Sequence, residues 1–345
     1  MALIPGEASS PDRILIWGVG AIGGTVAAYL RRAGVDVTVV DANDVHVQRI
    51  RDRGLAVTGP IEAFVQPLPA YTPNDLAGTW GIVFLCVKAQ HTEAATRQLR
   101  RHFSPDGVVV SLQNGFNELA IADVVGRECT MGAFINFGAD VLEPGVVHFG
   151  GRGAVVIGEL DGRQTERLAH VHNHLRKFEP GAITSDNIWG YLWGKMGYGS
   201  LLFASALTPA SIVEVLGSRD ARPLLTALAR EVMAVAATQA ITVMGFNGYD
   251  PTAFGANGSS AAIDASFDAM VSFNARSAKT HSGVWRDIAV HHRKTECDAQ
   301  FAPILEIAQA SHVAIPHIER LVSLMREVES GARAQTLENL ALLDG

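Results

Sequence analysis

Cysteine is scarce in this sequence, and its three cysteines, Cys86, Cys129 and Cys297, lie far apart along the chain. An odd number of widely separated thiols indicates neither a disulfide framework nor a cysteine-based metal cluster, and we expect no bound metal. We therefore expect reduced thiols and a cytoplasmic protein.

An excess of positive charge is also absent. The 28 lysines and arginines are outnumbered by 35 aspartates and glutamates, which gives a formal net charge of −7. This balance argues against a general nucleic-acid or anionic-membrane surface. No uncharged apolar run is long enough to span a bilayer. Residues 1–12 lack the basic and apolar segments of a signal peptide, and we expect them to form a flexible arm.

The most informative stretch is RILIWGVGAIGGTVAAYLRRAGVDVTVVD, from Arg13 to Asp41. It begins with an apolar strand at 13–17, breaks into a glycine-rich turn, continues as a helix at 25–32 and returns as a second strand at 37–40. A strand, a glycine turn, a helix and a second strand that ends in an acid are together typical of a dinucleotide-binding unit of the Rossmann type.

Each glycine of this turn has a physical role. Gly18 allows the tight turn, Gly20 lets the backbone approach a pyrophosphate, and Gly23 lets the helix pack closely on the strands. The phosphates would be bound by the N–H groups at the start of the helix, so the predicted cofactor-binding residues of the turn include Ala21 and Ile22 between the glycines.

Asp41 predicts which dinucleotide is bound. It follows Gly18 by about the 20 positions expected for the acid that binds the adenosine ribose. A carboxylate there accepts from ribose hydroxyls and repels a 2′-phosphate, and the next residues contain no arginine. NAD is therefore favoured over NADP. The alternative is that Asp41 is only a solvated acid at a strand end.

Two further polar residues follow apolar strands. Lys88 follows the run at 82–87, and Asn114 follows the run at 108–112. Ligands of open parallel sheets lie beyond the carboxyl ends of the strands, so these positions are functional candidates. The alternatives are a surface lysine and a turn asparagine.

The pattern changes near residue 183. Before it, strands and helices alternate, and the ranges 131–137, 145–149 and 154–157 are expected to be strands separated by glycines. After it, strand signals nearly vanish. We therefore predict an α/β fold with a Rossmann-type domain at 13–183 and a helical domain at 184–345. The segment 245–260, rich in Gly, Asn and Asp, is predicted to be a loop that is either an active-site cover or a long connection. Helices are expected at 187–206, 210–216, 221–239, 261–274, 287–310 and 318–330.

The order of short motifs resembles the ketopantoate reductase family. VGAIGG at 19–24 is followed by VKA at 87–89 and QNG at 113–115. A PGxVxxG segment at 144–150, a Trp-x-Lys at 193–195 and RKTECD at 293–298, on a late helix, then follow. The resemblance covers nearly the whole chain, from residue 13 to residue 330.

This resemblance implies a Rossmann domain and a helical domain that enclose a cleft, and hydride transfer from a nicotinamide to a 2-oxo acid. By the resemblance, Lys195 is the proton donor, Glu296 contacts the substrate or the lysine, Asn114 positions nicotinamide and substrate, and Lys88 lies along the cofactor. The alternatives are a solvated helix lysine for Lys195 and a helix-surface acid for Glu296. The chemistry is sensible, because charge that develops on the carbonyl oxygen must be met by a positioned donor. Burial beside Trp193 would lower the pKa of the lysine and improve it as an acid.

The sequence also departs from the family pattern. Asparagines are expected one and two helical turns after the lysine, where this chain has Gly199 and Phe203. A serine that binds substrate is expected near residue 282, and either Ser282 replaces it or the site falls on Gly283. His281 is either a second donor or a surface loop histidine. Because such a cleft has lost polar groups and gained an aromatic ring, we expect a 2-oxo acid other than ketopantoate, or a bulkier and less polar carbonyl compound.

We therefore expect an NAD-preferring dehydrogenase that acts on a 2-oxo acid and its 2-hydroxy acid, and a homodimer by analogy with the family. The alternatives are ketopantoate reductase itself, a secondary-alcohol dehydrogenase or imine reductase on the same fold, and an NAD-sensing regulator without turnover. The candidate residues are Lys195 and Glu296 as catalytic groups; Asn114, Gly199, Phe203, His281 and Ser282 for substrate; and Gly18, Gly20, Ala21, Ile22, Gly23, Asp41, Lys88 and Asn114 for cofactor.

Overall fold

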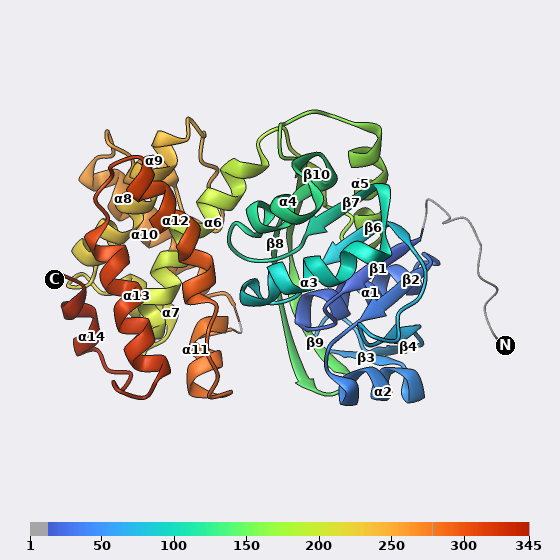
Figure 1. The fold of residues 1–345 in the computed structure, drawn as a ribbon. Coiled ribbons are helices and arrows are strands. Elements are labelled where there is room, and N and C mark those ends of the chain that lie inside the picture. The colour runs from blue at the N-terminus through green and yellow to red at the C-terminus, as the bar shows by residue number, and fades with distance from the viewer. Residues whose placement is uncertain (1–12, 278, 345) are drawn as a thin grey trace. The chain divides into compact units, whose positions relative to one another are not determined.

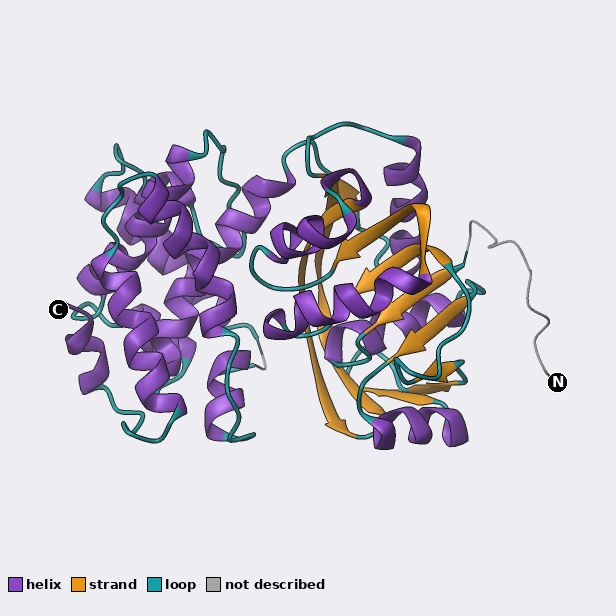
Figure 2. Cartoon of the chain, in the orientation of Figure 1, coloured by secondary structure: helices purple, strands orange, loops and turns teal. Residues whose placement is uncertain are grey.

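The computed structural model describes residues 13–277 and 279–344, so the arm predicted at 1–12 lies outside the described residues. The chain divides into two compact units, one extending to Ile188 and the other beginning at Trp189 (Figure 1). Strands belong to the first unit, and the described part of the second is built from helices (Figure 2). The predicted fold class is confirmed. No helix in the described ranges is long and apolar enough to cross a membrane.

The first unit is organised around one mixed ten-stranded sheet. Its strands follow the order β4-β3-β9-β8-β7-β6-β1-β2-β5, and β10 pairs with β9. The strands are β1 Ile14–Trp17, β2 Val37–Val40, β3 Leu55–Thr58, β4 Phe64–Gln66, β5 Ala70–Tyr71, β6 Trp80–Leu85, β7 Phe103–Ser111, β8 Thr130–Glu143, β9 Val146–Glu159 and β10 Ile183–Thr184.

Four neighbouring strands of this sheet run parallel and end together. Trp17 of β1 lies beside Val40 of β2 and Leu85 of β6, and Leu85 lies beside Ser111 of β7. The chain leaves β1 toward β2 on one side and returns on the other side as β6. This reversal of strand order creates the position where open α/β sheets bind ligands.

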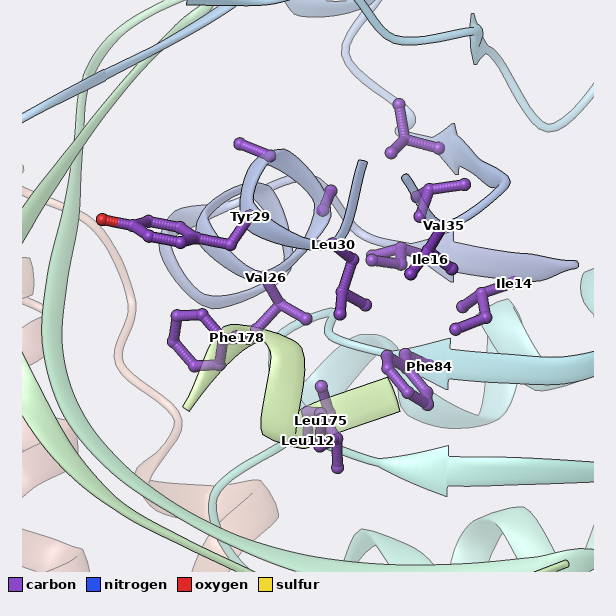
Figure 3. Packing of buried hydrophobic residues seen from close by; sticks show 14 of the residues in the cluster. Ile14, Ile16, Val26, Tyr29, Leu30, Val35, Phe84, Leu112, Leu175 and Phe178 are labelled. Carbon is purple, nitrogen blue, oxygen red and sulfur yellow. The ribbon is translucent and has the colours of Figure 1, made fainter. Parts of the chain in front are cut away.

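Helices cover both faces of the sheet. The apolar residues of α1 (Ala21–Arg32), α2 (Asp44–Arg53) and α5 (Glu166–Phe178) belong to one core cluster, and those of α3 (Thr92–Leu99) and α4 (Asn117–Val125) belong to a second cluster on the opposite face. Figure 3 shows Tyr29 of α1 close to Phe178 of α5, and the two rings meet edge to face with centroids 5.5 Å apart. Short 3-10 turns lie at Ala89–His91, Arg100–His102 and Arg127–Cys129.

The long β8–β9 hairpin corrects the prediction of separate strands divided by glycines. β9 continues unbroken from Val146 to Glu159, and β8 extends to Glu143 instead of ending at Phe137. The glycines serve as bulges: the register shifts on both sides of Gly138, and a β-carbon on Gly153 would lie 1.7 Å from the carbonyl oxygen of Asn136. A glycine inside a strand indicates a bulge or a close backbone approach.

The second unit contains helices α6 to α14. Their bounds are α6 Ile188–Ala206 (whose first residue belongs to the first unit), α7 Ile212–Gly217, α8 Arg222–Thr238, α9 Pro251–Phe254, α10 Ser260–Asn274, α11 Gly283–Ala289, α12 Cys297–Ala310, α13 Pro316–Glu329 and α14 Glu338–Ala341, followed by a 3-10 turn at Leu342–Asp344. The predicted loop at 245–260 contains α9 and is anchored in the interior, since Tyr249 and Phe254 are buried and stack on each other.

The helix predicted at 287–310 was wrong, because the chain breaks between α11 and α12. His292 adopts a left-handed backbone conformation with φ of 48°, which no α-helix accommodates. Arg293 then pairs with Asp287, at 2.6 Å between guanidinium and carboxylate. The Thr295 hydroxyl accepts from the backbone N–H of Cys297, the first residue of α12, at 3.1 Å and so satisfies an N–H that has no partner within the helix.

Candidate active site

Of the three glycines in the turn after β1 that are predicted to bind the cofactor, only Gly20 faces open space, which is where a phosphate would lie. Gly18 has φ of 99°, and a β-carbon on it would lie 2.7 Å from the backbone nitrogen of Val87. A β-carbon on Gly23 would lie 2.0 Å from the Gly18 carbonyl oxygen. On Gly20 the same atom would meet nothing within 4 Å. The first and third glycines are therefore required by packing, whereas the second faces open space.

The start of α1 presents backbone donors to that space. Because the N-cap residue is Gly20, no side chain caps the start of the helix, and the first turn carries no acid. Ala21 and Ile22, the first two helical residues, are partly exposed. The N–H groups of a helix's first turn have no intrahelical partner and are suited to an anion. The residues present therefore fit the pyrophosphate of a dinucleotide.

Asp41 lies beside this turn at the end of β2. Its Oδ2 accepts from the backbone N–H of Val19 at 2.7 Å, and its Oδ1 accepts from that of Asn43 at 2.9 Å. Each carboxylate oxygen can accept more than one hydrogen bond, so these contacts leave capacity for ribose hydroxyls. Asp41 is therefore more than a solvated acid at a strand end, because it also holds the glycine turn.

Lys88 and Asn114 follow the neighbouring strands β6 and β7 at the same edge. Lys88 is partly exposed and directly precedes the 3-10 turn at Ala89–His91, while Asn114 is exposed. The sheet therefore brings the loops of Gly18, Asp41, Lys88 and Asn114 to one edge, as the parallel registers require.

In the helical unit, Lys195 and Gly199 share one face of α6. The partly exposed residues of the central part of this helix are Tyr191, Lys195, Gly199 and Leu202, spaced by four, four and three positions, whereas Trp193 and Met196 are each 2% exposed. Residues at such spacing lie along one side of a helix. The accessible stripe of α6 therefore contains the predicted acid and the position one turn after it.

The glycines of α6 differ in what surrounds them. A β-carbon on Gly194 would lie 2.0 Å from the carbonyl oxygen of Met244, and one on Gly197 would lie 2.3 Å from the Tyr249 hydroxyl. These two glycines let α6 pack against the segment after α8. On Gly199 a β-carbon would meet nothing within 4 Å. Packing does not require a glycine there, and the space beside Lys195 is open.

Phe203 lies one turn beyond Gly199 and has a different environment. Its side chain is 2% exposed and packs edge to face on Phe301 of α12, with ring centroids 5.1 Å apart. This packing gives the ring a role in joining α6 to α12, and substrate contact by Phe203 stays a prediction.

His281 and Ser282 lie before α11. The Ser282 hydroxyl is the N-cap of α11 and accepts from the Trp285 N–H at 3.1 Å. His281 has both ring nitrogens engaged, by the Thr280 hydroxyl at 2.9 Å and by the Pro209 carbonyl at 3.2 Å, and its ring packs on Trp285. Both side chains fix the local chain, and their roles in substrate binding stay predictions.

Glu296 does not lie inside a helix, as was predicted for the RKTECD segment, but is the N-cap residue of α12. Its neighbour Lys294 pairs with Asp298 at 2.8 Å. The hydrogen bond to Asp298 raises the pKa of Lys294. Although burial opposes the effect, hydrogen bonds from Lys294 and Arg326 lower the pKa of Asp298. Lys294, the lysine nearest to Glu296 in sequence, therefore forms an ion pair with Asp298.

Two sequence models of one family match this chain. The one described as "Ketopantoate reductase PanE/ApbA" matches residues 14–162, and the one described as "Ketopantoate reductase PanE/ApbA C terminal" matches residues 187–329. The chain belongs to the ketopantoate reductase family. Membership in this family makes the protein an oxidoreductase of the hydroxy-acid class.

Curated relatives and solved structures match along most of the chain. A 2-dehydropantoate 2-reductase of Halobacterium salinarum is 26% identical over 325 residues, which cover 91% of this chain and 98% of that protein. A ternary structure of D-mandelate dehydrogenase with NADH and anilino(oxo)acetate has a TM-score of 0.81 at 21% identity and covers 92% of this chain and 99% of the other. A ketopantoate reductase structure from Ralstonia eutropha has a TM-score of 0.78 at 22% identity, with 92% and 99% coverage.

In this member of the ketopantoate reductase family, a buried polar network joins the Lys88 and Asn114 loops. Sequence reasoning missed it. Gln113 Nε2 donates to the Val87 carbonyl at 2.8 Å and to the Thr92 hydroxyl at 2.7 Å. That hydroxyl donates to Asn117 Oδ1 at 2.7 Å, and Asn117 Nδ2 donates to the Asn114 carbonyl at 2.6 Å. The only sequence signal was the occurrence of amide and hydroxyl residues just after two parallel strands.

The glycine turn gives a paired prediction. Gly20→Ala should leave thermal stability nearly unchanged, because its β-carbon meets open space, but should weaken NADH binding about tenfold or more by obstructing the pyrophosphate. Gly23→Ala should weaken NADH binding and also lower thermal stability, because its β-carbon collides with the Gly18 carbonyl. Thermal unfolding and NADH fluorescence titration measure the two effects. Equal NADH affinity in Gly20→Ala and wild type would contradict the phosphate role of the turn.

Proposed function

We propose that this family member is an NAD-preferring dehydrogenase that interconverts a 2-oxo acid and a 2-hydroxy acid, with a substrate other than ketopantoate. The observation that supports it most is the accessible stripe of α6, where Lys195 stands beside the open space at Gly199. A lysine supplies a proton donor, and the missing side chain leaves room for a substituent larger than the family's asparagine would allow.

The cofactor preference rests on charge. Asp41 stands at the end of β2, and Asp44 begins α2 three residues later. A 2′-phosphate near these carboxylates would be repelled, whereas ribose hydroxyls can donate to Asp41. Asn43, between the two acids, carries no charge to offset them. We therefore propose NAD as the cofactor.

The proposed mechanism needs one acid. When bound, the reduced nicotinamide supplies a hydride to the carbonyl carbon of the substrate. Lys195 stabilises the negative charge that develops on the carbonyl oxygen and gives that oxygen a proton from Nζ. Lys195 is only partly exposed on this stripe, which limits the hydration of its side chain. Glu296 is proposed to orient the lysine or the substrate.

The substrate class is argued from what the stripe lacks. A stripe that offers no amide at Gly199 gives a hydroxylated substrate fewer partners. The structure of D-mandelate dehydrogenase, which shares the fold, was solved with anilino(oxo)acetate, an oxo acid that carries an aromatic group. We propose a 2-oxo acid with a bulky apolar substituent. A homodimer is also proposed, as a Staphylococcus aureus ketopantoate reductase is described as dimeric.

Lys195→Ala tests the acid. Turnover of NADH with a responsive 2-oxo acid should fall about 100- to 10,000-fold, the range for loss of general acid catalysis, while the dissociation constant for NADH stays within about twofold. Steady-state rates over a panel that includes ketopantoate and phenylglyoxylate measure it. Lys177→Ala, an exposed lysine of α5, is the control and should keep full turnover. Near-normal turnover in Lys195→Ala would reject the mechanism.

Asp41→Asn tests the cofactor preference. The amide oxygen can still accept from the Val19 N–H, so the glycine turn keeps a partner while the charge that repels a 2′-phosphate is removed. We expect the ratio of NADH to NADPH affinity to fall about tenfold or more. Asp44→Asn, which removes an exposed acid nearby, should change the ratio less. An unchanged ratio in Asp41→Asn would show that this carboxylate does not select the cofactor.

Gly199→Leu tests the substrate space. A leucine side chain would occupy the open region beside Lys195, so KM for phenylglyoxylate should rise about tenfold, while pyruvate and NADH should bind nearly as before. Gly199→Ala is the control, and it should raise stability by about 0.5–1 kcal/mol because alanine favours a helix. If the leucine variant uses large and small substrates in the wild-type ratio, Gly199 does not determine size.

A further inference from the structure

Both polar backbone groups of Val19, the residue between the first two glycines of the turn, are bound by side chains from elsewhere in the first unit. Its N–H donates to Asp41, as described above. Its carbonyl oxygen lies 2.9 Å from Nε2 of His46, a residue of α2 that is only 5% exposed. The position of the turn therefore depends on two side chains as well as on its own glycines.

The tautomer of His46 follows from its second contact. The backbone N–H of Gly145 donates to Nδ1 of His46 at 3.0 Å. A ring nitrogen that accepts carries no hydrogen, so the hydrogen is on Nε2, which donates to the Val19 carbonyl. His46 is thus a neutral bridge with one accepting and one donating nitrogen.

The far end of this bridge is firmly held. Gly145 forms the turn between β8 and β9 with φ of 81°, and a β-carbon on it would lie 2.3 Å from Cγ of Arg49 on α2. The Gly145 carbonyl accepts from the N–H of Ala56 on β3 at 2.9 Å. This turn is part of the Pro144–Gly150 motif that marks the family in the sequence. The contact gives the motif a physical connection to the dinucleotide turn.

We propose that His46 is a positioning residue for the dinucleotide, acting through the Val19 carbonyl and anchored by Gly145. With Asp41 on the other side, it fixes the Val19 peptide groups and hence the direction of the following N–H groups, which meet the pyrophosphate. The role rests on the proposed dinucleotide function. Fixing donors before the ligand binds removes the cost of ordering them during binding.

The two hydrogen bonds can be separated by substitution. In His46→Gln the amide nitrogen falls near the place of Nε2, so the donor to Val19 is kept and the Gly145 contact is lost. In His46→Asn the amide oxygen falls near the place of Nδ1, so the Gly145 contact is kept and the donor to Val19 is lost. A purely structural histidine would make the two changes equivalent for NADH, whereas a positioning role makes the asparagine variant worse.

NADH titration of the full-length protein decides between these outcomes. We expect His46→Asn to raise the dissociation constant about tenfold, the effect of losing one hydrogen bond of about 1.4 kcal/mol, and His46→Gln to raise it less than about threefold. The KM for NADH should follow, with kcat at saturating NADH nearly unchanged. Thermal unfolding is measured in parallel, so that a loss of folded protein is seen separately.

His102→Asn and His102→Gln are the matched controls. His102 is also buried in the first unit, and its Nδ1 contacts the Gly78 carbonyl at 3.1 Å on the other face of the sheet, so neither change should alter NADH affinity. Equal NADH affinities for His46→Asn and His46→Gln would overturn the positioning role. If wild type itself binds no NADH, the proposed function fails first, and that result is distinct because it needs no variant.

Discussion

A β-carbon on Gly23 would lie 2.0 Å from the carbonyl oxygen of Gly18, and the geometry of the nucleotide-binding edge depends on the absence of that atom. The close approach of Gly23 to Gly18 lets α1 begin directly above the end of β1, so the first N–H groups of α1 face outward beyond the strand. Gly18 in turn crosses the backbone of Cys86 and Val87 after β6. Any side chain at either glycine would push α1 away from the sheet and move its donors from the edge where Asp41, Lys88 and Asn114 collect.

Patterns local in sequence predicted the parts of this site that are local in space. The glycine turn, both strands of the first βαβ unit and the position of Asp41 follow from spacing and from the period of apolar residues. The glycines of β9 were misread because a glycine signals a turn and a bulge equally well, and only the pairing with β8 distinguishes them. The break before α12 was missed because its cause, a left-handed His292, carries no glycine or proline signal; histidine adopts this conformation more often than most residues, but only in a small minority of cases.

Contacts between distant residues were invisible to that reasoning. His46 meets Val19 across 27 positions and Gly145 across 99, and Gln113 meets Thr92 across 21. Each is a hydrogen bond between ordinary polar residues on separate elements, so no local period or composition marks it. α6 shows the same limit within one helix. Gly194 and Gly199 look alike in the sequence. A β-carbon on Gly194 would collide with the Met244 carbonyl, whereas Gly199 borders open space.

The role that we propose for Asp41 in cofactor choice is linked to the shape of the turn, because the same carboxylate holds Val19. The carboxylate that we propose to disfavour a 2′-phosphate also accepts the Val19 N–H, so a residue that removes the charge and offers no other acceptor would also release one side of the glycine turn. An NADP-binding member of the family with this arrangement needs another acceptor for that N–H, such as an asparagine or serine side chain. His46 holds the opposite side of Val19 without any charge and is compatible with either cofactor. In the roles that we propose, Asp41 on the β2 side serves both cofactor selectivity and positioning of the turn, whereas His46 on the α2 side serves positioning alone.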